Sequence, residues 1–494
     1  MGADIEGTPF TREQRQRYRE KVRQDLDVFE RMLHTRGFEF DRQLTGMEIE
    51  LNLVGSDMQP AMVNAAVLES ISDPDYQTEL GQYNIELNVS PRPMPGDEAL
   101  RLEADLRDSL NRADQQAQQA GARIVTIGML PTLMPDHFHT EWMSANARYA
   151  ALNEAIFAAR GEDLFLDIEG PSGERLATYA DSIAPESACT SVQLHLQVRP
   201  LQFASYWNAA QAFSGVQLAV GANSPYFFGK QLWHENRIEV FKQATDVRSI
   251  ELKNQGVRPR VWFGERWITS IFDLFEENVR YFPALLPESS DEDPVALFEA
   301  GKAPELAELR LHNGTVYRWN RPIYDIVDGR PHLRVENRVL PAGPTIIDTM
   351  ANSAFYYGVV RMLAEDERPI WTRMSYAAAT ENFYECARHG IEAKVYWPGF
   401  GEVSADELVL RHLLPLAHEG LEQWGVAPSV RERYLGVIEG RCRAGVNGAS
   451  WQIACVKALE AQGLQRTDAL AKMLELYLVG MSDNVPVHEW ELPG

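Results

Sequence analysis

The stretch TGMEIELNLV, Thr45–Val54, alternates apolar and polar side chains, as a β-strand with one buried and one polar face does. Its apolar positions, from Met47 to Leu53, predict a core face, and the opposite face carries Glu48, Glu50 and Asn52. The two glutamates would lie about 7 Å apart along the strand, given a rise of about 3.3–3.4 Å per residue. Because carboxylates this close repel each other where water is excluded, they require a proton or a cation. The stretch therefore predicts a strand that binds a divalent metal.

Three later stretches repeat this alternation: Tyr83–Ser90 (YNIELNVS), Ser191–Val198 (SVQLHLQV) and Leu333–Val339 (LRVENRV). Their polar faces carry, in chain order, Asn84, Glu86 and Asn88, then Ser191, Gln193, His195 and Gln197, and then Arg334, Glu336 and Arg338. A single strand of this kind is typical of a half-exposed sheet. Together, the acidic and histidine side chains at matching phases favour one shared site.

Placing these strands in one antiparallel sheet would bring their polar faces together on one concave surface. The side chains that would converge there are Glu48, Glu50, Glu86, His195 and Glu336, with Glu79 at the edge. Several carboxylates and one imidazole suit hard cations, Mg²⁺ or Mn²⁺, better than Zn²⁺, and this many acidic ligands indicates more than one ion. Such a site suits the binding of a triphosphate.

In this order and rough spacing, the strands resemble those of the glutamate–cysteine ligase family, in particular its bacterial carboxylate–amine ligase branch, within the glutamine synthetase-like superfamily. Three further segments are similar to segments of that family: RYAALNEAI (Arg148–Ile156), ANSPYFFGK (Ala222–Lys230) and ENFYECARHGI (Glu381–Ile391). The resemblance runs from about residue 40 to about residue 400. It rests on the ordered set of segments, because no single motif here is as specific as a phosphate-binding loop.

The resemblance implies an α+β fold: an antiparallel sheet with a concave polar catalytic face, flanked by helices and followed by an α-rich C-terminal region. It implies an ATP- and Mg²⁺-dependent ligase of the kind used in glutathione biosynthesis. ATP would phosphorylate the γ-carboxylate of glutamate, and an amine such as cysteine would attack the acyl phosphate. The metal ligands would be Glu48, Glu50, Glu79, Glu86, His195 and Glu336.

Basic and amide side chains complete the expected site. Arg237, Lys242 and Arg248 form a local positive cluster. Phosphate contacts are one interpretation of this cluster, and salt bridges to neighbours such as Glu239 are the other. The resemblance favours catalytic contacts of Arg237 and Arg338 with phosphates or the substrate carboxylate. The full expected set is Arg237, Lys242 and Arg338 for ATP or phosphate, and Gln193 and Asn88 for substrate.

Composition limits the partners. The chain has 494 residues, 45% of them hydrophobic, with a net charge of −24 and a pI near 4.9. Nucleic acids and anionic membranes usually bind basic surfaces, so neither is expected. No apolar leader and no membrane-length apolar run is seen, and the four cysteines lack C-x-x-C spacing. We therefore expect a cytoplasmic protein that binds small molecules; whether it forms a homo-oligomer is left open.

The expected organisation has three parts: an N-terminal helical segment (1–40), a catalytic α+β domain (41–344) and a helical region packed on it (345–494). The first helix is expected over 11–36, with Thr11 as N-cap and Gly37 at its end. The acidic segment 286–308 is expected to form either a lid or a surface loop. Further helices are expected at 345–364, 375–389, 405–424, 429–443, 449–462 and 466–480.

Alternative functions differ in the acceptor. A ligase of the same kind could join glutamate or another acid to a different amine, because nothing in the sequence identifies the amine pocket. A metal-dependent phosphotransferase acting on a guanidino or similar acceptor would share the fold. A non-catalytic nucleotide- or metal-binding protein is disfavoured, because a degenerate site would be expected to lose some of its acidic, histidine or E-x-R strands.

Overall fold

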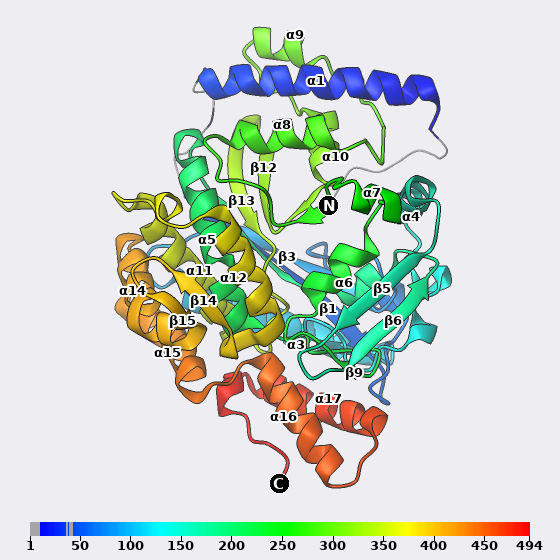
Figure 1. The fold of residues 1–494 in the computed structure, drawn as a ribbon, viewed down its shortest axis with the longest axis vertical. Coiled ribbons are helices and arrows are strands. Elements are labelled where there is room, and N and C mark those ends of the chain that lie inside the picture. Colours follow the sequence, from blue (N-terminus) through cyan, green and yellow to red (C-terminus); the bar gives the residue numbers. More distant parts are fainter. Residues whose placement is uncertain (1–9, 36–37, 39–42) are drawn as a thin grey trace.

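An antiparallel sheet occupies the centre of the molecule (Figure 1). The computed structural model describes residues 10–35, 38 and 43–494. The sheet's strands follow in the order β12 (Asn320–Val327), β13 (Arg330–Asn337), β7 (Val192–Gln197), β1 (Leu44–Val54), β3 (Asn84–Pro93) and β2 (Tyr76–Thr78), with β4 (Arg123–Val125) also paired to β1. The four strands predicted from alternation are therefore direct neighbours, and the predicted α+β fold class is confirmed.

The register of the sheet aligns the polar side chains. Glu50 of β1 lies opposite Glu86 of β3, and Glu48 lies opposite Gln193 of β7. Across the next pair of strands, His195 lies opposite Glu336. On the other face of β1, Met47, Ile49, Leu51 and Leu53 are buried, as predicted. Pairing without a slip between these residues keeps every acidic side chain on the same face.

The second acidic strand extends beyond the stretch Tyr83–Ser90 into the segment SPRPMPG, although prolines normally end a strand. β3 continues to Pro93, which lies opposite Leu44, and the register shifts between Thr45 and Met47. β2 pairs with β3 only as far as Leu87, so the end of β3 is an edge strand. Proline is tolerated there because it has no N–H to donate to a second neighbour.

Two buried helices support the central sheet. α5 (Phe203–Gly221) and α11 (Ile346–Glu365) are buried around nearly their whole circumference, as helices of a large core are. Tyr357 of α11 donates its hydroxyl hydrogen to the backbone oxygen of His195 at 3.2 Å. This contact ties α11 to the strand that carries the candidate ligand.

The C-terminal region is helical, as expected. The observed helices are α11, α12 (Tyr376–His389), α13 (Ala405–Leu408), α14 (Leu414–Gln423), α15 (Pro428–Ala444), α16 (Gly448–Ala461) and α17 (Arg466–Asp483). The helix expected over 405–424 is interrupted by a π-helical turn at Val409–Leu413, and the hairpin of β14 (Lys394–Trp397) and β15 (Gly401–Ser404) was not predicted. Arg441 of α15 forms a fully buried ion pair with Asp348 of α11 at 2.7 Å, which joins these helices to the core.

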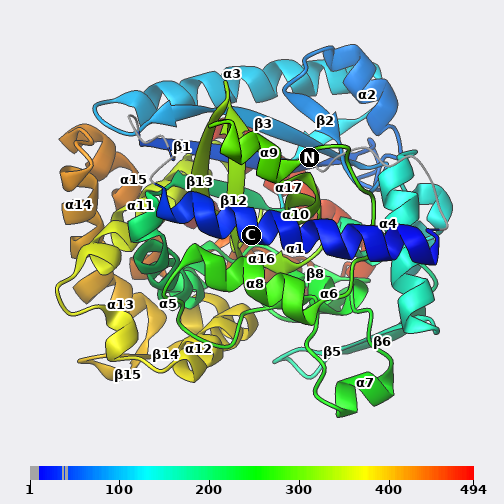
Figure 2. The ribbon, with the colours of Figure 1, turned by 90° about the horizontal axis from the view of Figure 1, so that it is seen from above.

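The first helix, α1 (Arg12–His34), lies across one end of the molecule (Figures 1 and 2). The predicted N-cap is confirmed: Thr11 accepts a hydrogen bond from the backbone of Gln14 at 3.2 Å. The predicted end at Gly37 lies outside the described residues. Lys21 of α1 donates to the backbone oxygen of Glu292 at 3.0 Å and pairs with Glu308 at 3.2 Å. The acidic excursion over 286–308 is thus packed against α1, on an outer surface.

The remaining elements surround this framework. They are α2 (Asn64–Ile71), α3 (Glu98–Gln119), α4 (Ala147–Arg160), β5 (Leu164–Glu169), β6 (Arg175–Ala180), β8 (Tyr226–Phe227), β9 (Lys230–Gln231), α6 (Arg237–Ala244), α7 (Ile250–Asn254), β10 (Val261–Trp262), α8 (Ile271–Tyr281), α9 (Pro294–Glu299), α10 (Ala307–Asn313) and β11 (Tyr317–Arg318). In the described part of the chain, no helix is long and apolar enough to cross a membrane.

Candidate active site

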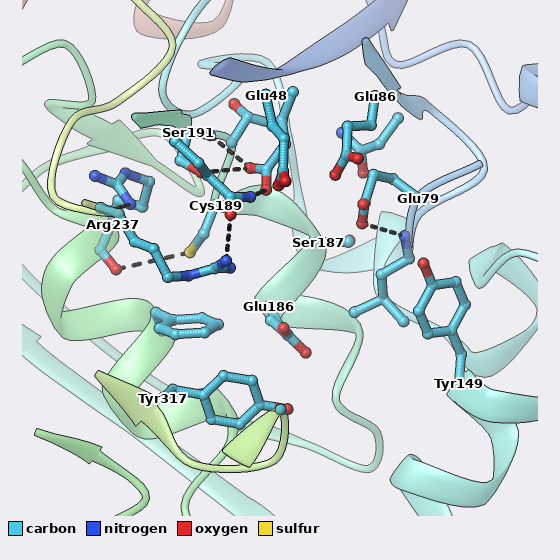
Figure 3. A pocket seen from close by; sticks show the side chains of 18 of the residues that line it. Glu48, Glu79, Glu86, Tyr149, Glu186, Ser187, Cys189, Ser191, Arg237 and Tyr317 are labelled. Atoms are coloured by element: carbon cyan, nitrogen blue, oxygen red, sulfur yellow. Dashed lines mark hydrogen bonds between the residues drawn. The ribbon is translucent and has the colours of Figure 1, made fainter. Parts of the chain in front are cut away.

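A cavity of about 220 Å³ lies over the polar face of the sheet (Figure 3). Its floor is formed by side chains of β1, β3 and β7. The opposite wall comes from α4, α6, β11 and the short 3-10 turn Ala184–Ala188, called η3. Its volume is below the roughly 300–1,000 Å³ of most small-molecule sites. It therefore suits the reacting groups of small substrates.

The predicted metal ligands lie in two groups of three. In each group, ligand atoms approach one another within 4.8 Å; group one is Glu48, His195 and Glu336, and group two is Glu50, Glu79 and Glu86. β1 contributes one carboxylate to each group, because Glu48 and Glu50 are two residues apart on the same face. The structure thus brings the six side chains into two groups, including Glu79, which lies before β3; Glu48, Glu50, Glu79 and Glu86 line the cavity, whereas His195 and Glu336 are not lining residues.

Group one is balanced by protein cations. Arg321 of β12 donates to Glu336 Oε1 at 2.9 Å, and the Arg338 guanidinium lies 3.6 Å from Glu336 Oε2. Burial raises the pKa of Glu336, but the charges of Arg321 and Arg338 outweigh it and hold this pKa well below its usual range. Burial likewise raises the pKa of Glu48, and the hydrogen bond with His195 helps to bring it below its ordinary value. Both carboxylates are therefore charged.

His195 has a partner on each ring nitrogen. Arg334 donates from Nε to His195 Nδ1 at 3.1 Å, and His195 Nε2 lies 3.0 Å from Glu48 Oε1. With Nδ1 accepting, Nε2 carries the proton and donates it to Glu48. To bind a metal through Nε2, His195 would have to give up this proton and turn Nδ1 away from Arg334. Its role as a ligand stays a prediction.

Group two lacks such compensation. Glu50 Oε2 accepts from the Ser191 backbone at 2.5 Å, Glu50 Oε1 accepts from Gln193 at 2.9 Å, and Glu79 and Glu86 lie close to Glu50 in the same group. Burial raises the pKa of Glu50 to about 7, although Arg338 partly offsets it. Burial and the neighbouring carboxylates also raise the pKa values of Glu79 and Glu86. Without a cation, this group retains protons at neutral pH.

Two arginines line the cavity, one beside the floor and one on the opposite wall. Arg338 follows β13 and donates to the side-chain oxygen of Gln193. Burial lowers the pKa of Arg338, but the surrounding carboxylates, led by Glu336, raise it by more than burial lowers it. The pKa therefore lies above its ordinary value, and this guanidinium keeps its charge. Arg237 lines the same cavity from α6 and is held by Glu235 at 3.0 Å and by the backbone oxygen of Val339. Both side chains are placed to meet an anionic group.

Other predicted contacts lie apart from the cavity lining. Lys242 forms a salt bridge with Glu239 at 2.6 Å, which agrees with the salt-bridge interpretation of the positive cluster. Arg248 pairs with Asp246 at 2.8 Å. Asn88 lies opposite Glu48 on the neighbouring strand, but it is not a lining residue. The functional roles of Lys242 and Asn88 stay predictions.

Several lining residues were missed by the sequence analysis. Arg321 is the cross-strand partner of Glu336, and the alternation of Asn320–Val327 was the signal that could have found it. Tyr149, Glu186 and Tyr317 lie on the wall opposite the sheet (Figure 3). They come from a helix, a turn and a two-residue strand, whose local patterns carry no sign of a shared cavity.

Comparisons with known proteins agree with this geometry. The model of glutamate–cysteine ligase family 2 matches residues 44–461. A solved glutamate–cysteine ligase from Francisella tularensis, in complex with AMP, is similar over 93% of this chain and 91% of its own, with a TM-score of 0.56 and 11% identity. A bifunctional glutathione synthetase from Pasteurella multocida matches 93% of this chain and 55% of its own, with a TM-score of 0.46 and 13% identity. No curated protein matches in sequence.

Family and fold together define an ATP-dependent carbon–nitrogen ligase that joins a carboxylate to an amine. The chain belongs to glutamate–cysteine ligase family 2, and the matched region contains all six candidate metal ligands.

Proposed function

We propose that the protein uses ATP to activate the γ-carboxylate of glutamate and joins it to an amine such as cysteine. The observation that carries this proposal is the pair of acidic groups on one sheet face, with Arg338 beside both. A carboxylate-activating ligase must bring two anions together, the triphosphate and the acid. Acidic side chains serve this purpose only when they hold cations.

The donor set fits two hard divalent cations, Mg²⁺ or Mn²⁺. Group two offers only carboxylate oxygens, which retain protons because no cation balances them. Glu50, Glu79 and Glu86 would hold one ion, and Glu48 and Glu336, with His195 once rearranged, would hold the other. When bound, such ions neutralise charge that develops on the transferred phosphoryl group.

The chain's own residues supply binding and orientation. Arg338 and Arg237 lie where they can bind the phosphoryl oxygens and the substrate carboxylate, and Gln193 fixes the direction of the Arg338 guanidinium. The γ-carboxylate oxygen of glutamate attacks the γ-phosphorus of ATP, and ADP leaves. The amine nitrogen then attacks the acyl carbon, and phosphate departs. Fixed arginines lower the barrier because they need not reorganise as negative charge moves.

Measuring ADP release tests this proposal. The reaction contains ATP, Mg²⁺ and glutamate, with and without a panel of amines that includes cysteine. Release that requires both glutamate and cysteine supports the full proposal. Release driven by another amine retains the chemistry and changes the acceptor. An absence of release with every amine overturns glutamate as the acid.

A further inference from the structure

The wall opposite the sheet carries a carboxylate that the proposed phosphoryl chemistry does not use. Glu186 lies on η3 and lines the cavity. The turn is held firmly: Ser187 lies 2.8 Å from the Tyr83 hydroxyl and donates to the backbone oxygen of Ala184 at 2.6 Å, and Ile183 donates its backbone N–H to Asn153 at 2.9 Å. Glu186 is therefore presented from a fixed position.

Glu186 is a lining acid that belongs to neither acidic group and has no partner among the described residues. Of the other lining carboxylates, Glu48, Glu50 and Glu79 each have a hydrogen-bond partner on the protein, and Glu86 lies in group two with Glu50 and Glu79. In the described part of the chain, the Glu186 carboxylate has neither a hydrogen bond nor an ion pair, although burial raises its pKa to about 7. Glu186 is half-buried, and a carboxylate largely withdrawn from water normally has a partner, so an unpaired one facing a cavity indicates a ligand that supplies the missing donor.

The surroundings of Glu186 indicate the kind of ligand. Tyr149 and Tyr317 flank it, and Figure 3 shows all three facing the open space across from Glu48 and Glu86. Burial, followed by nearby carboxylates that include Glu186, raises the pKa of both tyrosines, and burial also raises that of the Cys189 thiol. These three groups stay protonated at neutral pH. Glu186 is thus the group on this wall that can accept a proton.

The floor and the opposite wall of the cavity would serve two different steps of the reaction. Phosphate and activated acid belong on the floor, where Glu48, the three carboxylates of group two and Arg338 line the cavity. An amine adds to the acyl carbon through an open face of its carbonyl group, and with phosphate and acid held on the floor the open space lies towards the wall of Glu186. Primary amines arrive mostly as ammonium ions at neutral pH, and nitrogen attacks only after it has lost a proton.

We propose that Glu186 binds the ammonium group of the acceptor and removes its proton, with Tyr149 and Tyr317 packing against the apolar part of a small primary amine. This inference rests on the proposed function. One N–H bond of the ammonium breaks and its proton passes to the Glu186 carboxylate. The freed lone pair forms the C–N bond, the bond from acyl carbon to phosphate oxygen breaks, and the second nitrogen proton leaves with phosphate. Glu186 then returns its proton to water.

Two acceptors separate this role from acid activation. Purified Glu186→Gln and wild-type protein are given ATP, Mg²⁺ and glutamate with cysteine, or with the amine of the panel that drives most ADP release. Parallel reactions contain hydroxylamine, which is uncharged at neutral pH and traps an acyl phosphate without a base. We expect the variant to lose amide formation by about 100-fold or more, the usual size of a lost acid–base group, while hydroxamate formation is unchanged.

The pH profile and matched variants complete the test. The residual amide rate of Glu186→Gln should rise towards alkaline pH, where the amine is already neutral, and Glu186→Asp should recover part of the activity. Asp181→Asn, which alters an exposed carboxylate earlier in the same segment, should behave as wild type. Equal effects of Glu186→Gln on both acceptors, or an effect on neither, would overturn the role of Glu186. A wild-type protein that forms neither product would instead overturn the proposed function, and this inference with it.

Discussion

At the scale of single residues, the two acidic groups differ in what balances their charge. Glu48 has a side chain that is 21% exposed and pairs with His195, whereas Glu336 is 2% exposed and is surrounded by Arg321 and Arg338. Removing the partly exposed carboxylate of Glu48 leaves little buried charge without a partner. Removing a buried one leaves arginines without a partner, which destabilises the fold.

Glu48→Ala should therefore separate activity from stability. We expect ADP release to fall by at least about 100-fold, the upper end of what loss of an outer-shell partner costs at metal sites. The thermal midpoint should change little. Glu336→Ala should lose both activity and stability. Turnover assays and thermal unfolding of the two variants check this, and normal turnover in both would rule out the site.

Group two predicts a pH-dependent response to metal. The folded-state pKa of Glu50 is raised from 4.5 to about 7, so its contribution to stability is present at low pH and is lost as the pH rises through about 7. Once this proton is lost, the buried carboxylate lowers the stability of the fold, and a bound cation removes that cost because it takes the place of the protons. The increase in thermal midpoint on adding Mg²⁺ should thus be larger at about pH 8 than at about pH 6. Equal increases at the two pH values would contradict this prediction.

At the scale of elements, β1 serves both the core and the site. Leu51 lies on its apolar face and is fully buried, whereas its chain neighbours Glu50 and Asn52 lie on the polar face. Leu51→Ala should lower the free energy of unfolding by about 2–5 kcal/mol, as expected for a core truncation. Denaturant unfolding measures this, with Leu201→Ala, at a 96% exposed position, as the control. A loss as large in the control would mean that burial is not the cause.

The strands were predictable because alternation is a local property. Glu48, Glu86, His195 and Glu336 each lie on a strand whose apolar neighbours fix the face. Glu79 lies on no predicted strand: the sheet arrangement put it only at the edge of the expected surface, and its role as a ligand came from the family resemblance. Glu186 depends on how a turn packs against α6 and the sheet, and no pattern in the sequence near residue 186 encodes that contact. Pro91 and Pro93 favour an end of the strand near residue 90, and the sequence does not reveal that β3 continues as an edge strand, because this depends on its neighbours in the sheet.

At the scale of the whole molecule, the C-terminal helices are joined to the core by buried charge. Arg441 and Asp348 are 1% and 0% exposed, and Asn352 also accepts from Arg441 at 2.6 Å. Arg441→Leu should cost about 3–5 kcal/mol, because Asp348 would be left buried and unpaired. Arg443→Ala, which removes an exposed ion pair with Glu439 on the same helix, should cost no more than about 0.5 kcal/mol. Chemical denaturation compares the two variants, and similar costs would contradict the role of burial.

The division of the cavity into a sheet floor and a wall of loops and short elements has an evolutionary consequence. Carboxylates on the floor are locked by strand register, since shifting one of them by a single position would turn it into the core. The wall consists of η3, α4, α6 and β11, where substitutions leave the sheet intact. Descendants of such a protein can exchange one acceptor for another by changing the wall, while inheriting the phosphoryl chemistry of the floor unaltered.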